Sequence, residues 1–185
     1  MLIDSHQASR FISEYKTVLL ELHNLSGEAM QADIIKNLAS ARSHLKANPN
    51  SLDGVLTALE LAGKPISPDI QQALKSLRIE QWVYLRSTTR YAIFLDPSAN
   101  DAYAVLGLNN SVEEIVGTNA VAFEAGLFSF AGQYVCDGII QTPILLGPGY
   151  KKQFSASLAN IRRCGRFHST PEPEKTPTQE LKRLE

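Results

Sequence analysis

The stretch EQWVYLRSTTRYAIFL, residues 80–95, is where the hydrophobic pattern of this chain changes from helical to extended. Two runs within it, residues 82–85 and 91–95, are rich in aromatic and β-branched side chains, which favour strands. Ser87, Thr88 and Thr89 lie between the runs and are typical of a turn. The stretch therefore predicts two strands joined by a tight turn, and it opens the β-rich part of the chain.

The sequence after residue 95 continues in short apolar runs. Residues 96–101 are typical of a loop, because Asp, Pro, Ser and Asn are frequent in turns. The segment Asn109-Asn110-Ser111 predicts a hairpin turn between strands at 102–108 and 112–116. Further strands are expected at 120–128 and 133–146. The pattern thus predicts five to seven short antiparallel strands that form a curved sheet or a small barrel.

Before residue 79, apolar residues recur at helical spacing in about four segments. We expect Asp4 or Ser5 to cap the first helix and Ser26 the second, and the third to run from about Ser51 to Gly63. Ser67-Pro68-Asp69 predicts the start of the fourth, with Pro at the first helical position. The pattern leaves open whether these helices form a bundle of their own or pack onto the sheet.

After the β-rich part, Tyr150, Phe154, Leu158 and Ile161 recur at intervals of four, four and three. This spacing predicts one further helix laid on the sheet. Beyond His168 the composition shifts to Ser, Thr, Pro, Glu and Lys, which predicts a disordered tail. The sequence therefore predicts an α+β fold with three parts: helical residues 1–78, β-rich residues 79–168 with the last helix, and a tail at 169–185.

The totals exclude several classes of protein. Eighteen Lys and Arg against 19 Asp and Glu give a net charge of −1, so attraction to nucleic acid or to a membrane would need a local patch. The start of the chain does not have the pattern of a signal peptide, and no apolar run reaches the length of a membrane span. Two cysteines suit a reducing compartment. We expect a cytoplasmic protein with no membrane partner.

The charge pattern of the last helix is the clearest candidate for a binding site. At 100° per residue, its cations fall opposite the apolar stripe. These are Lys151, Lys152, Arg162 and Arg163, with Arg166 just beyond the helix. Ordinary solvation accounts for most such faces, but cations in the first turn oppose the helix dipole. The alternative is a site for an anion or for nucleic acid.

No arrangement of residues predicts a catalytic, metal or cofactor site. Cys136 is followed by Asp137, which would oppose formation of a thiolate, so a buried structural cysteine is favoured. Cys164 and His168 make only half of a zinc site. Asp96 and Asp101 share a loop without the spacing of a calcium-binding EF-hand. We expect no catalytic residues, no metal and no cofactor.

The hairpin at residues 80–95 mixes aromatic and basic side chains. Such a mixture on a sheet face can stack bases and hold phosphates, as in proteins that bind single strands. The competing interpretation places the aromatic side chains in the core and turns the arginines outward. That interpretation is favoured, because no RNA-binding signature accompanies the mixture. The residues in question are Trp82, Tyr84, Arg86, Arg90, Tyr91 and Phe94.

These observations favour a non-enzymatic binding protein with a protein partner. The first alternative is a protein that binds nucleic acid through its basic C-terminal helix. The second is an enzyme whose site is assembled from residues distant in sequence, with Cys136, Asp137 and His168 as its candidate members.

Overall fold

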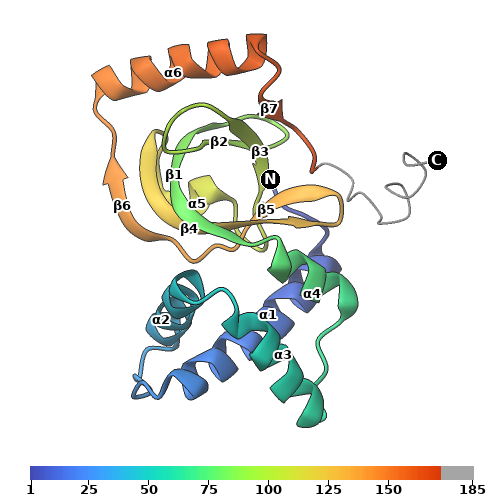
Figure 1. Ribbon diagram of the computed structural model, residues 1–185. Coiled ribbons are helices and arrows are strands. Elements are labelled where there is room, and N and C mark those ends of the chain that lie inside the picture. The colour runs from blue at the N-terminus through green and yellow to red at the C-terminus, as the bar shows by residue number, and fades with distance from the viewer. Residues whose placement is uncertain (172–185) are drawn as a thin grey trace, which may run out of the picture.

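The computed structural model describes residues 1–171 and shows an α+β architecture in which a β-barrel lies between a layer of helices and one further helix (Figure 1). The helical layer precedes the barrel in the chain, as the sequence predicts. The helices are α1 (Ser5–Ser26), α2 (Ile34–Ala47), α3 (Ser51–Leu61), α4 (Pro68–Lys75), α5 (Val112–Val116) and α6 (Pro148–Arg163).

Five strands close the barrel in the order β1-β2-β3-β5-β4, with β4 pairing back onto β1. The sequence predicts antiparallel strands, but the sheet is mixed, because β3 runs parallel to β5 and to β7, while the other pairs are antiparallel. β6 extends the sheet beyond β4. The strands are β1 (Arg78–Ser87), β2 (Ala92–Leu95), β3 (Ala102–Leu106), β4 (Val121–Phe130), β5 (Gln133–Cys136), β6 (Gln141–Leu145) and β7 (Phe167–His168).

The barrel interior is aromatic. Successive side chains of a strand point to opposite faces, so alternate residues of β1, β2 and β4 enter the barrel. Trp82, Tyr84, Phe94 and Phe123 are all fully buried there, and the indole N–H of Trp82 donates to the carbonyl of Ala125 at 3.0 Å. Such a core is stabilised both by its buried area and by edge-to-face ring contacts.

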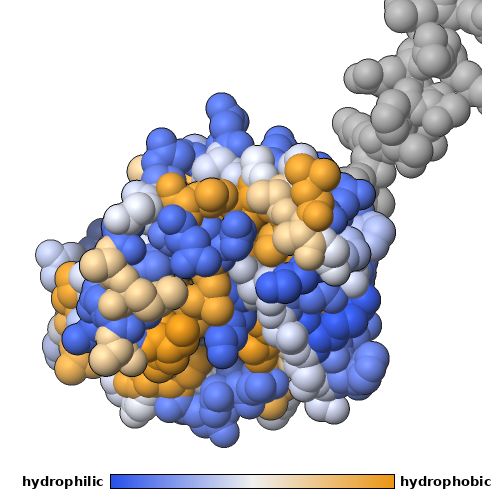
Figure 2. All heavy atoms as spheres, turned by 90° about the horizontal axis from the view of Figure 1, so that it is seen from below, coloured by the Kyte–Doolittle hydropathy of each residue, from blue (hydrophilic) through white to orange (hydrophobic). Residues whose placement is uncertain are grey.

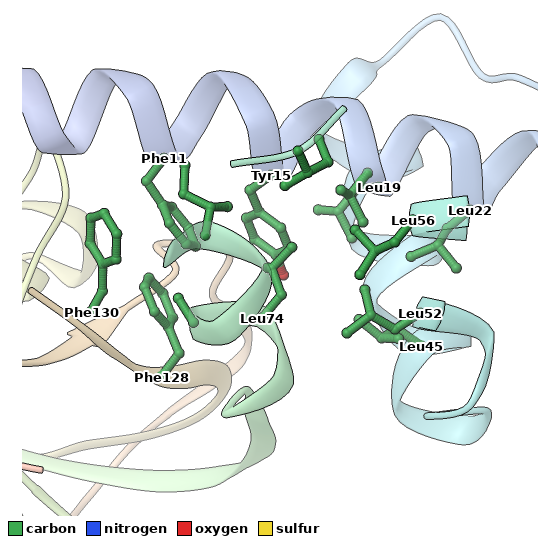
Figure 3. Packing of buried hydrophobic residues seen from close by; sticks show 14 of the residues in the cluster. Phe11, Tyr15, Leu19, Leu22, Leu45, Leu52, Leu56, Leu74, Phe128 and Phe130 are labelled. Atoms are coloured by element: carbon green, nitrogen blue, oxygen red, sulfur yellow. The ribbon is translucent and has the colours of Figure 1, made fainter. Parts of the chain in front are cut away.

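The helical layer shares its apolar cluster with one outer face of the barrel. The ring of Phe11 on α1 stacks on that of Phe128 on β4, with centroids 4.3 Å apart, and Phe130 lies beside them (Figure 3). Farther along α1, Leu19 and Leu22 pack against the other helices. The helices therefore bury their stripes on each other and on the barrel together.

The helix α6 covers a second part of the outer surface. Leu158 and Ile161 are buried against outward-facing residues of β1 and β2, including Leu85 and Ile93. Phe154 is partly buried in the same cluster. The stripe that the sequence predicts thus lies on the sheet, as expected.

Two local predictions are wrong. Residues 112–116 form the helix α5 and not a strand, because Ser111 and Glu114 make a reciprocal capping box at its start. The second helix does not begin after Ser26, which ends α1 before Gly27 in the left-handed conformation (φ 73°). The predicted tail falls almost wholly on residues 172–185, outside the described residues. Among residues 1–171, no helix is long and apolar enough to cross a membrane.

We expect Leu158→Ala to lower the free energy of unfolding by about 2–5 kcal/mol, because it removes a buried side chain and leaves a cavity. Leu158 is 3% exposed, whereas Leu145 on β6 is 71% exposed and provides a matched control. Leu145→Ala should change stability by no more than about 0.5 kcal/mol. Urea unfolding followed by the fluorescence of Trp82, the single tryptophan, measures both. Equal losses in the two variants would contradict the packing of α6.

Candidate functional site

The basic strip, defined as Lys151, Lys152, Arg162, Arg163 and Arg166, is exposed along its whole length. None of these side chains forms a salt bridge with another residue of the described part of the chain. Arg163 donates to the side-chain oxygen of Asn160 at 2.8 Å. The guanidinium of Arg162 lies 4.9 Å from the ring centroid of Phe167, a cation–π distance. The predicted site residues therefore lie exposed on α6 and just beyond it, without an acidic partner among the described residues.

The charges of the second half of the chain are strongly segregated. Residues 91–150 contain no Lys or Arg, and residues 138–171 contain no Asp or Glu. The net charge of −1 is therefore the sum of a basic segment that contains α6 and an acidic segment that contains most of the barrel. Such local fields act on a partner even when the net charge is close to zero.

A cleft of about 700 Å³ lies beside the C-terminal end of the strip. The ring of Tyr91 lines this cleft and packs on the ring of Phe167, with centroids 5.8 Å apart. The guanidinium of Arg162 lies over the same Phe167 ring. Its walls come from the N-terminal segment, the β1–β2 turn, β3, the β4–β5 turn with the start of β5, and the residue after β7. They include Asp4, Arg90, Tyr91, Gln133 and Ser169.

The N-terminal segment is held at this cleft by backbone hydrogen bonds. The N–H of Ile3 donates to the carbonyl of Gly107 at 3.1 Å, and the N–H of Gly107 donates to the carbonyl of Met1 at 3.0 Å. The segment therefore lies parallel to the end of β3 as part of the cleft wall.

The mixed aromatic and basic hairpin divides as the core interpretation predicts. Trp82, Tyr84 and Phe94 are inside the barrel, whereas Arg86 and Arg90 are exposed. Only Tyr91 is half-buried at the surface, where a base or another ring can reach it. Base stacking by the whole hairpin is therefore excluded.

A buried charge centre joins the helical layer to the barrel. Arg42 on α2 is 0% exposed and donates to both carboxylate oxygens of Asp137, at 3.3 and 3.1 Å. It also donates to the carbonyl of Ile139 and, at 2.9 Å, to the side-chain oxygen of Gln141. A buried charge is tolerated only when it is paired and hydrogen-bonded in this way.

Asp137 is surrounded by donors from several elements. The backbone N–H groups of Gly126 and Ile139 each donate to Oδ1 at 3.1 Å, and the hydroxyl of Tyr15 on α1 lies 3.5 Å from Oδ2. Burial raises the pKa of Asp137, and Arg42 and the backbone donors act in the opposite direction. Burial and the neighbouring carboxylate also raise the pKa of Tyr15 well above its usual value.

Sequence reasoning missed Arg42, although one signal was present. Leu38 precedes it by four residues and Leu45 follows it by three, so this cation lies on the apolar side of its helix. A charged residue in that position needs a buried partner, but nothing in the sequence identifies Asp137 as the partner.

The three residues of the enzyme hypothesis do not form one site. Cys136 and Asp137 are neighbours in the chain, but burial and Asp137 raise the pKa of Cys136 to about 12, so its thiol stays protonated. His168 lies with other partners: its Nε2 is 2.7 Å from Asp101, and its ring stacks on Tyr103. The burial expected of Cys136 is confirmed by its 1% exposure.

The remaining candidates have local structural roles. Asp96 accepts the backbone N–H groups of Asn100 and Asp101, as a turn requires. Cys164 is exposed and lies 3.9 Å from the side-chain oxygen of Asn160. Within residues 1–171, no group of three or more His, Cys, Asp or Glu side chains is placed to hold a metal ion.

Comparison of the chain with models of protein families, with curated proteins and with solved structures finds no match.

We expect Gly126→Ala to destabilise the protein strongly, by about 2 kcal/mol or more, because the new methyl group would displace the buried carboxylate of Asp137 from its partners. A Cβ at this position would lie 2.4 Å from Oδ2 of Asp137. Gly54 on α3 has no atom within 4 Å of such a Cβ, so Gly54→Ala should stabilise the protein by about 0.5–1 kcal/mol. Chemical unfolding measures both changes, and the same sign in the two variants would contradict the close approach.

We expect only one thiol of the native protein to react with a thiol-specific reagent. The thiolate is the reactive species, and the protonated, buried thiol of Cys136 supplies almost none. Cys164→Ser should therefore be unreactive until denaturant is added. Rapid modification of the native Cys164→Ser protein would contradict the burial of Cys136 and restore it as a candidate nucleophile.

Proposed function

We propose that this chain is a non-enzymatic binding protein that holds single-stranded nucleic acid against the basic strip and the cleft beside it. The observation that carries the proposal is the exposed, acid-free strip of five cations without salt bridges. Phosphate groups are the natural ligands of such a surface, because their binding releases counterions.

The position of the cleft supports a single strand over a duplex. Phosphates on Arg162 and Arg166 would leave their bases within reach of Tyr91 and the cleft walls. Proteins that bind single strands without sequence preference combine a basic track with aromatic side chains in this way. A duplex keeps its bases stacked inside and would use the cations alone.

The architecture gives a second, weaker support by analogy. A five-stranded barrel with β1 paired to β4, β3 parallel to β5 and a helix between β3 and β4 has the strand arrangement of OB-type barrels. Those barrels bind oligonucleotides or oligosaccharides between the β1–β2 and β4–β5 loops. Both loops line the cleft here. A shared fold does not establish function, so the charges of the basic strip carry the proposal.

The proposal predicts salt-sensitive binding of single-stranded oligonucleotides. Changing Lys151, Lys152, Arg162 and Arg163 to Gln should weaken binding and make the dependence of log K on log salt shallower by up to about 3 units, the loss of four phosphate contacts. Fluorescence anisotropy with labelled DNA and RNA strands, from about 50 to 200 mM salt, measures the slope. A hairpin duplex of the same composition should bind more weakly.

A matched control removes the same charge from the helical layer. Lys16, Lys36, Lys64 and Lys75 are exposed there, and changing all four to Gln alters the net charge equally. This variant should retain the wild-type slope. Equal effects in both variants would mean that only net charge matters. No binding of wild-type protein at low salt would refute the proposal and identify the strip as a solvated face.

A further inference from the structure

A second concave surface lies far from the cations of α6, between the helical layer and the barrel. This apolar groove has a volume of about 500 Å³. Ile12 of α1 and Leu38 of α2 line one side, and Ile139 and Ile140, between β5 and β6, line the other. Both its size and its lining are typical of a site that binds a ligand or a peptide side chain.

The opening of the apolar groove exposes more aliphatic surface. Ile35 on α2 is 66% exposed and Ile115 on α5 is 41% exposed, and both line the groove from opposite elements. Ile34, which precedes Ile35 in the chain, and Met30, in the segment before α2, are also exposed, at 41% and 55%. Figure 2, which views the molecule from the side of the helical layer, shows hydrophobic side chains gathered at the surface between hydrophilic ones. Exposed aliphatic side chains at the mouth of a groove are typical of an interaction site.

The walls of the groove are fixed before any partner arrives. Asp137 lies at the groove, and its bonds to Arg42 and to the N–H of Ile139 hold the β5–β6 link in place. On the same barrel wall, the capping box of Ser111 and Glu114 sets the orientation of α5 and thus of Ile115. A site that is already rigid loses little conformational entropy when a partner binds.

The charges around the groove indicate the kind of partner. The barrel wall belongs to residues 91–150, which lack Lys and Arg, and Glu113 and Glu114 are exposed next to Ile115. On the helical wall, Asp33 precedes Ile34, and the exposed Lys36 follows Ile35. Lys16 is exposed one turn from Ile12. The wall formed by α5 is therefore acidic, while the helical wall carries both signs.

We propose that the apolar groove is the docking site for an amphipathic helix of a partner protein, aliphatic on the buried face and basic on the flank that meets α5. Ile35 and Leu38 are three residues apart on α2 and form a ridge against which another helix can pack. Helices of this type bind apolar grooves through anchors spaced by three and four residues. The inference is independent of nucleic-acid binding, which uses the opposite charge on another surface.

The test uses two synthetic helical peptides and full-length protein. One peptide has Leu at every third or fourth position and Lys elsewhere, and the other has Glu in place of Lys. Fluorescence anisotropy should show binding of the Lys peptide and much weaker binding of the Glu peptide. Ile35→Ser and Ile115→Ser should each weaken binding of the Lys peptide about tenfold or more, because anchor contacts dominate such interfaces. Glu113→Lys should weaken binding of the Lys peptide and strengthen binding of the Glu peptide.

Leu61→Ser is the matched control, because Leu61 is 84% exposed and does not line the groove. It should bind the Lys peptide as the wild type does, and thermal melting should show all four variants folded. The proposal is overturned if both peptides bind equally, or if Ile35→Ser and Ile115→Ser bind as the wild type. Oligonucleotide binding by the same variants should be unchanged, so failure here is distinguishable from failure of the α6 site.

Discussion

The pairing of Arg42 with Asp137 is the constraint on which the arrangement of the helices and the barrel depends. Neither side chain reaches solvent, so each charge is tolerable only with the other beside it. Asp137 also stands where β5 ends and receives the N–H of Gly126 from β4. One carboxylate thereby ties α2 to two strands, and Tyr15 brings α1 to the same point. These directed bonds add geometric constraints to the apolar packing between the helical layer and the barrel.

With the helical layer fixed on one outer face and α6 on another, the cleft at Tyr91 and the apolar groove differ in character. The cleft at Tyr91 adjoins cations, while the apolar groove adjoins Glu113 and Glu114. Under the two proposals the surfaces bind ligands of opposite charge, which would not compete for a site. On those proposals, a chain with a net charge near zero would act as an adaptor between a polyanion and a basic protein segment, each attracted to its own side.

Features that depend on neighbours in the chain could be predicted from sequence, and features that depend on distant contacts could not. The stripe and the cations of α6 follow from helical periodicity alone, so both were expected. Val112 and Val116 have a strong β tendency, and this outweighed the capping signal of Ser111 and Glu114, which was present in the sequence. Arg42 and Asp137 are 95 positions apart, and no local pattern relates them. The cleft likewise combines five separated segments of the chain.

The two ends of the described chain meet at one place, because Met1 and Ser169 both line the cleft at Tyr91. An affinity tag or fluorescent protein fused to Met1 would be attached at the entrance of this cleft, and the hydrogen bonds of Met1 and Ile3 to Gly107 would hold its first residues there. A bulky fusion at that end would therefore obstruct ligands. The turn after α3, where Gly63 and Lys64 are exposed on the helical layer, offers an insertion point for a label away from the cleft.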